Sequence, residues 1–230
     1  MIRTSARRRA RLLAPLVWTA CLLAVPSATP AAGRIEGTVR LTMATRASLA
    51  SGSYAPRAVN RTSTQTGSVE DVVIFMRDVP AEAALPLSRT RIIQKDEAFE
   101  PRVVAITRGS TVDFPNADPY FHNVFSLSGG ASFDLGRYKQ GESRSRVFPK
   151  PGLVKVYCHV HSQMSASILV MGNDHFTRPG AGGSFTLTDI PAGTWRLSAW
   201  QERLGETLQS IRVVPGQTTR VEFNLPLVTE

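Results

Sequence analysis

Short apolar stretches, separated by glycine, proline and small polar residues, recur along the whole chain. In some of them apolar and polar positions alternate, as in 34–43, and others are continuously apolar, as in 71–76. Alternation is typical of a strand with one buried face, and a short continuous run is typical of a strand buried on both faces. Further segments of these kinds lie at 91–94, 102–107, 111–114, 123–127, 143–148, 153–157, 166–171, 208–214 and 219–225, and on both sides of a turn at 190–193. Helical periodicity is almost absent, so the pattern predicts an all-β Greek-key sandwich.

The connections between these segments predict which strands are neighbours. We expect the proline-rich connection at 149–152 to pair the strands on either side of it. Pro215-Gly216 is expected to form a hairpin in the same way. The residues Phe99-Glu100-Pro101 and the stretch that follows Gly172 are expected to be connections without strands.

The first 28 residues are typical of an export signal. Five arginines precede an apolar stretch at 12–25, and the small residues that follow offer cleavage sites. The stretch is too short for a comfortable membrane span, and no later segment approaches 18 apolar residues. Cys21 lies in a string that matches a lipoprotein signal poorly, because Trp18 stands where leucine is expected. We therefore expect a periplasmic or otherwise exported protein with no transmembrane segment after removal of the signal, and without a lipid anchor at Cys21.

Removal of the signal changes the charge and the cysteine count. The whole chain has a formal net charge of +9, and this falls to +4 because five arginines and no acidic residue lie in 1–28. No dense basic stripe with interleaved aromatic residues remains, which argues against nucleic-acid binding. Cys158 becomes the one cysteine of the mature chain. A single thiol in an oxidising compartment is vulnerable unless it is occupied, and a metal ion would occupy it.

The seven residues 158–164 carry the candidate chemistry. Cys158, His161 and Met164 are spaced at intervals of three after an apolar strand, so a tight turn could direct all three to one point. A second histidine, His122, lies upstream among aromatic residues. One thiolate, two imidazoles and a thioether form the ligand set of a mononuclear blue-copper centre. Zinc is the alternative metal, although structural zinc is usually held by four cysteines or histidines rather than by a thioether.

This combination of residues is similar to the cupredoxins, most closely to the amicyanin type with its short ligand loop. Further motifs resemble exported cupredoxin-like proteins of the methylamine-utilisation type: Gln94-Lys95-Asp96, Phe114-Pro115-Asn116, His122-Asn123-Val124-Phe125-Ser126 and Tyr157-Cys158. The resemblance covers 90–172 and implies one type 1 copper held by His122, Cys158, His161 and Met164. It also implies that Asn123 ties the two ligand loops together by hydrogen bonds.

A second resemblance concerns the two ends of the chain. Gly37-Thr38-Val39, Gly183-Ser184-Phe185 and the turn at 189–195 are similar to carboxypeptidase-regulatory-like, transthyretin-like sandwiches. This implies a second small β-sandwich over 183–230, to which the strands and the flexible loop of 34–76 would contribute. The cupredoxin-like part at 90–172 would then be inserted in that sandwich or followed by it.

These observations favour a periplasmic electron carrier that cycles between Cu(II) and Cu(I) and that is not an enzyme. The expected partner is a redox protein such as a c-type cytochrome or a periplasmic dehydrogenase. Tyr120, Phe121 and Val160 could form an apolar docking patch, and His159 is expected to be a surface residue, with an exchanged or extra ligand as the alternative. Asp118 is interpreted as a turn residue. Two other functions remain open: copper delivery or sensing, and a non-redox β-sandwich binding module.

Overall fold

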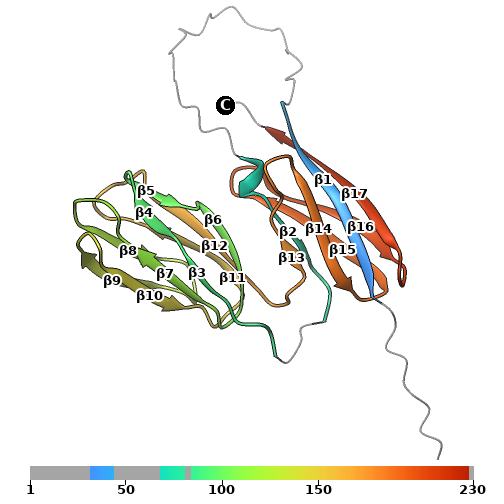
Figure 1. Cartoon of the computed structure of the whole chain (residues 1–230), viewed down its shortest axis with the longest axis horizontal. Helices are drawn as coiled ribbons and strands as arrows, with labels where there is room; N and C mark the ends of the chain where they lie inside the picture. Colours follow the sequence, from blue (N-terminus) through green and yellow to red (C-terminus); the bar gives the residue numbers. More distant parts are fainter. Residues whose placement is uncertain (1–31, 44–67, 81–83, 228–230) are drawn as a thin grey trace, which may run out of the picture.

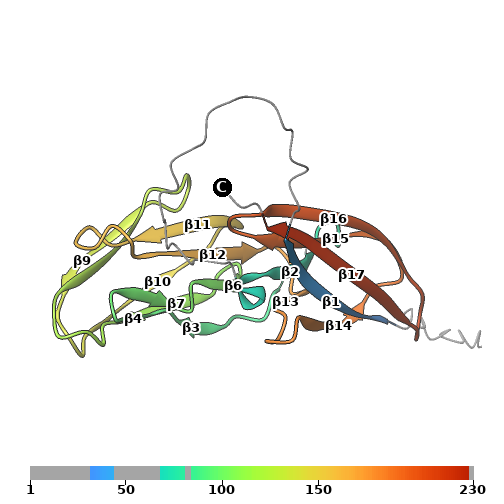
Figure 2. The ribbon, with the colours of Figure 1, turned by 90° about the horizontal axis from the view of Figure 1, so that it is seen from above.

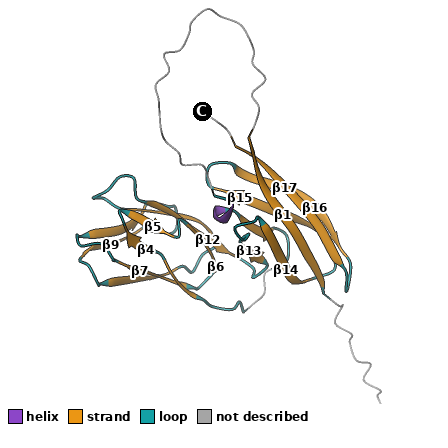
Figure 3. Cartoon of the chain, turned by 45° about the horizontal axis from the view of Figure 1, so that its top comes forward, coloured by secondary structure: helices purple, strands orange, loops and turns teal. Residues whose placement is uncertain are grey.

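The computed structural model describes residues 32–43, 68–80 and 84–227. The predicted signal at 1–28 with Cys21, and most of the loop after residue 43, lie outside the described residues. Within those ranges the regular structure consists of strands β1–β17 and one short 3-10 turn, η1 (Figure 3). No helix of the described chain has the length and apolar character that a membrane span requires. The predicted all-β sandwich class is confirmed.

The middle of the chain forms one sandwich, here called the central sandwich. A five-stranded sheet, β6-β12-β11-β8-β9, faces a three-stranded sheet, β10-β7-β3, and the hairpin β4-β5 lies beside them. The bounds are β3 Arg89–Arg91, β4 Ile93–Lys95, β5 Ala98–Glu100, β6 Val103–Thr107, β7 Thr111–Pro115, β8 His122–Ser126, β9 Phe133–Tyr138, β10 Ser143–Val147, β11 Gly152–Tyr157 and β12 Ser165–Met171. Its core contains buried side chains such as Phe99, Phe114 and Ile168.

The remaining strands form the terminal sandwich, which lies beside the central one (Figure 1). Its two sheets are β14-β1-β17 and β13-β2-β15-β16. The bounds are β1 Gly33–Met43, η1 Val69–Asp71, β2 Val73–Met76, β13 Phe176–Thr177, β14 Ser184–Ile190, β15 Gly193–Gln201, β16 Gly205–Val213 and β17 Thr218–Leu227. In sequence, the central sandwich is therefore placed between β2 and β13.

The continuously apolar strands are those that contact both sandwiches. Along β12, Ile168 belongs to the core of the central sandwich, whereas Leu169 and Met171 pack against Val73 in a third cluster between the sandwiches. In β2, Ile74 points instead into the core of the terminal sandwich. Because successive side chains of a strand point to opposite faces, burial of both faces requires an unbroken apolar run. Each fully buried aliphatic side chain of this kind contributes roughly 1.5–3 kcal/mol.

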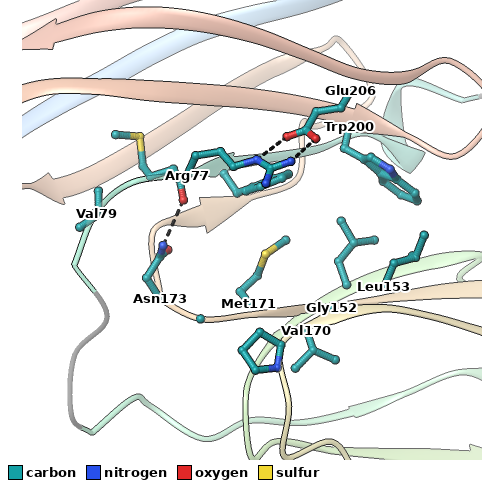
Figure 4. A pocket seen from close by; sticks show the side chains of 14 residues that line it. Arg77, Val79, Gly152, Leu153, Val170, Met171, Asn173, Trp200 and Glu206 are labelled. Carbon is teal, nitrogen blue, oxygen red and sulfur yellow. Dashed lines mark hydrogen bonds and ion pairs between the residues drawn. The ribbon is translucent and has the colours of Figure 1, made fainter. Parts of the chain in front are cut away.

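A cleft of about 510 Å³ remains between the two sandwiches (Figure 4). Its walls include Met171 from β12 and Trp200 from β15. At one side Arg77 donates two hydrogen bonds to the Glu206 carboxylate, of which the Nε–Oε1 bond is 2.8 Å long. Asn173 Nδ2 donates to the carbonyl of Met76 at 3.0 Å on the other side. These polar groups at the cleft are thus satisfied by one another.

Two predicted strand pairings are wrong. Strand β10 pairs with β7 in one sheet, whereas β11 pairs with β12 and β8 in the other, so residues 149–152 cross between the sheets. Pro149 and Pro151 have no N–H group to donate to a hairpin ladder. Strand β16 likewise pairs with β15 and β17 with β1, and the turn at Pro215-Gly216 changes sheet.

The structure also adds strands that the sequence pattern did not predict. Residues Phe99 and Glu100 belong to β5, which pairs with β4, and are not a connection. The stretch after Gly172 contains β13, which pairs with β2. The short lengths of β5 and β13 explain the error, because two or three residues are too few to establish an alternation.

Replacing Gly183 with alanine is expected to lower the free energy of unfolding by about 3 kcal/mol or more. Gly183 has a φ of +80°, and an added Cβ would lie 2.2 Å from the carbonyl oxygen of Val39. That backbone is fixed, since the Val39 N–H donates to the Gly183 carbonyl at 2.8 Å. Urea unfolding checks this against Gly182→Ala, whose Cβ meets nothing within 4 Å. Equal stability of the two variants would contradict the expectation.

Candidate metal centre

Three metal-ligating side chains converge at one end of the central sandwich. One ligand atom from each of His122, Cys158 and His161 lies within 4.8 Å of the others. His122 Nδ1 is 3.8 Å from Cys158 Sγ and 3.2 Å from His161 Nδ1. His122 and Cys158 are buried, at 0% and 4% exposure. The structure thus brings together the thiol and both imidazoles that the sequence singled out.

Two strand ends position these ligands. His122 is the first residue of β8, and Cys158 follows directly after β11, which pairs with β8 in the same sheet. Between β11 and β12 the chain makes a tight loop, in which the Met164 N–H donates to the His161 carbonyl at 3.0 Å. This loop lies at the end of the central sandwich that is remote from the terminal sandwich (Figure 2).

The fourth predicted ligand, Met164, closes the same loop. Its carbonyl accepts the Cys158 N–H at 3.3 Å, and its side chain is 1% exposed. The thioether packs in the core of the central sandwich together with the Cys158 thiol. Met164 is therefore held beside the cysteine by the backbone and is buried, whereas the His161 side chain is 20% exposed.

Asp118 is a functional candidate that the sequence reasoning missed. Its Oδ2 lies 2.7 Å from His122 Nε2, and both side chains are almost fully buried. An ionised carboxylate can only accept, so Nε2 carries the proton and the Nδ1 lone pair points to the cluster. The carboxylate thereby selects the tautomer of His122 that can bind a metal ion. The available signal was only the position of Asp118, four residues before the histidine in a loop with two prolines.

The Asp118 carboxylate is itself held by backbone groups. Its Oδ1 accepts the Asp96 N–H at 2.7 Å and its Oδ2 accepts the Glu97 N–H at 3.0 Å. Burial alone raises the pKa of Asp118, but the bonds to His122, Glu97 and Asp96 outweigh burial and place this pKa below its ordinary value. Asn116 supports the loop, because its Oδ1 accepts the Asp118 N–H at 2.9 Å.

Asn123 joins the two ligand loops. Its Oδ1 accepts the His159 N–H at 2.7 Å, and its Nδ2 is 3.4 Å from Asp134 Oδ1. His159 lies inside the ligand loop, but its side chain is 52% exposed and the centre of its ring is 3.8 Å from that of the Phe125 ring. The imidazole of His159 is therefore not part of the converging cluster.

An exposed aromatic side chain lies beside the His161 ring, and the other predicted patch residues are also exposed. Tyr120, Phe121 and Val160, the three residues predicted to form a docking patch, are 43%, 56% and 44% exposed. The Tyr120 ring lies 5.9 Å from that of His161 and 5.6 Å from that of His122. Tyr120 therefore places a partly exposed aromatic ring beside both candidate imidazoles.

The donor set fits copper. His122 Nδ1 faces both the Cys158 sulfur and His161 Nδ1 at 3–4 Å, an arrangement that a shared cation would stabilise. Imidazole and thiolate with a thioether nearby are typical of copper, whose softness matches sulfur donors. Two imidazoles and one thiolate can also bind zinc, so the geometry alone leaves zinc as the alternative.

Comparisons with known proteins find cupredoxins among similar structures and do not establish a family. No protein-family model and no curated protein matches the chain. Among solved structures, it is similar to a purple cupredoxin from Nitrosopumilus maritimus, with 23% identity over 36% of this chain and 99% of that chain and a TM-score of 0.33. A copper-containing nitrite reductase from Thermus scotoductus matches at 27% identity over 42% of this chain and 25% of that chain, with a TM-score of 0.35. The reduced state of an amicyanin mutant matches at 21% identity over 36% of this chain and 82% of that chain, with a TM-score of 0.34.

Proposed function

We propose that this chain is an exported mononuclear type 1 copper protein that carries single electrons. The observation on which the proposal depends is the convergence of His122 Nδ1, Cys158 Sγ and His161 Nδ1, with Met164 closing the same loop. Copper, when bound, would supply a one-electron Cu(II)/Cu(I) couple. Residues 1–28 support export, since their arginines and apolar stretch are typical of an export signal.

The protein's part in such a function is to hold the ligands in a fixed geometry. Electron transfer is fast when the ligands hardly move between the two redox states, and hydrogen bonds around a site supply that stiffness. His122 is held by Asp118, and the loop that carries Cys158 is tied to β8 by Asn123. Met164 would supply a weak thioether donor that tunes the potential.

The path for electrons would pass through the exposed edge of His161. It is the ligand that reaches the surface, and Tyr120, Phe121 and Val160 would exclude water around it on contact with a partner. The partner we propose is a redox protein such as a c-type cytochrome or a periplasmic dehydrogenase. Four donors would complete the coordination and leave no position for a substrate, which favours a carrier over an enzyme.

Titration of the mature protein with Cu(II), followed by visible absorption and EPR, tests the proposal. A thiolate–copper centre is expected to give intense visible absorption and narrow copper hyperfine splitting at one equivalent of metal. A colourless, tightly held Cu(I) form that resists oxidation would instead favour copper delivery or sensing. Failure to bind stoichiometric copper would exclude both functions and leave a non-redox β-sandwich binding module.

A further inference from the structure

The turn between β4 and β5 contacts groups at both candidate histidine ligands. Its backbone N–H groups at Asp96 and Glu97 donate to Asp118, whose carboxylate lies against His122 Nε2. The Glu97 side chain lies against the other imidazole, with its Oε1 at 3.7 Å from His161 Nε2. One turn, more than twenty residues before the first candidate ligand in the chain, therefore contacts the carboxylate that supports His122 and the ring of His161.

The Glu97 carboxylate, whose side chain is 43% exposed, lies against two residues of the ligand loop. Gln163, in the ligand loop, donates through Nε2 to Glu97 Oε2 at 3.0 Å. The other oxygen is left for His161 Nε2, and a small side-chain rotation would shorten the 3.7 Å separation to a hydrogen bond. Accepting the Nε2–H of His161 would leave its Nδ1 unprotonated and directed at the cluster, as Asp118 does for His122.

The backbone of the turn adopts a conformation that aspartate tolerates but that is unfavourable for glutamate. Asp96 and Glu97 have φ values of 53° and 54°, in the left-handed region that glycine and asparagine tolerate best. A two-residue hairpin with this geometry is most stable with a sequence such as Asn-Gly. Non-glycine residues that persist in such strained positions are concentrated at functional sites. Glutamate at position 97 is therefore expected to make the folded state less stable than glycine would, while it places a carboxylate beside His161.

We propose that the β4–β5 turn is a third positioning loop of the metal centre, with Glu97 as the positioning residue for His161. The proposal rests on the proposed copper function. It assigns a role to Asp96, the last residue of the Gln94-Lys95-Asp96 motif, and it predicts that the exposed ligand is held by a carboxylate in the same way as the buried one.

Two substitutions at Glu97 test the proposal. Glu97→Gly removes the carboxylate but keeps the backbone N–H for Asp118 and relieves the strained φ, so the metal-free protein should unfold at a higher urea concentration. Its Cu(II) affinity, measured by competition with a chelator, should nevertheless fall about 10–100-fold. Glu97→Gln keeps an acceptor for His161 and should lose less affinity. Glu100→Gln, which removes an exposed carboxylate from the same hairpin, is the matched control and should bind copper as the wild type does.

Nitrogen-15 NMR of the metal-free protein supplies a second measurement that does not depend on copper. His161 is expected to populate the Nε2–H tautomer in the wild type and a mixture of tautomers in Glu97→Gly. Unchanged affinity together with an unchanged tautomer ratio in Glu97→Gly would overturn the proposal, as would an equal loss of affinity in Glu100→Gln. If the wild type binds no copper, the proposed function fails, and the tautomer ratio alone decides whether Glu97 orients His161.

Discussion

The copper-loaded Cys158→Ser variant is expected to lose the intense visible absorption completely. Cys158 is the one cysteine among the described residues, and its sulfur is directed at His122 Nδ1. A serine hydroxyl is a hard donor that stays protonated at neutral pH, so it cannot replace the thiolate. The measurement is a visible and EPR spectrum at one equivalent of Cu(II), with circular dichroism to verify the fold. Cys158→Ala provides a second variant without a buried hydroxyl.

A control for this prediction is His159→Gln in the same loop. The His159 side chain is half exposed and packs on Phe125, so its loss should leave the spectrum unchanged. Loss of colour in His159→Gln would instead support the interpretation of His159 as an exchanged or extra ligand. Persistence of the intense band in both Cys158 variants would show that the colour does not arise from a thiolate, and the proposed centre would be wrong.

The candidate cluster could be proposed from the sequence because its chemistry is local. Three of its members lie within seven residues after an apolar strand, and Cys158, His161 and Met164 need only a tight turn to converge. The groups that orient them could not be predicted in the same way. Asp118 looks like an ordinary loop residue, and its role depends on N–H groups of a turn that lies about twenty residues away in the chain.

Strand positions were predictable for a similar reason, and strand partners were not. The pattern of apolar and polar residues is a property of one strand. The alternation in β1 and the apolar run in β12 could therefore be recognised in the sequence. Pairing depends on which sheet a strand joins, and prolines at 149 and 151 are compatible with either a hairpin or a crossover. The continuous apolar run of β12 indicated burial on both faces, but not that the second face would pack against the terminal sandwich.

The Asp118→Ala variant is expected to bind Cu(II) about 10–100-fold more weakly than the wild type. Without the carboxylate, His122 can place its proton on Nδ1, the atom that faces the cluster. The variant also leaves the N–H groups of Asp96 and Glu97 without their acceptor. These donors lie in a partly exposed turn, where water can replace part of what is lost, but a hydrogen bond to a charged group contributes about 1.5–3 kcal/mol, so unfolding by urea should show a loss of about that size even without metal.

This loss of stability should depend on pH in a defined direction. The pKa of Asp118 in the folded protein lies below its ordinary value, so the ionised carboxylate stabilises the fold at pH values above about 4. As the pH falls through the lower folded value, the wild type loses that contribution and the variant does not. The difference in unfolding free energy between the two proteins should therefore shrink in acid.

Two further variants separate the orienting role of Asp118 from a general effect of losing a buried carboxylate. Asp118→Asn keeps one oxygen that can accept from both Glu97 and His122, so it should fall between the wild type and Asp118→Ala in copper affinity. Asp113 is also buried, but its carboxylate binds Arg89 and Ser145. Asp113→Ala should therefore lower stability and leave copper affinity unchanged. Equal losses of affinity in Asp113→Ala and Asp118→Ala would mean that Asp118 acts through overall stability and not through the tautomer of His122.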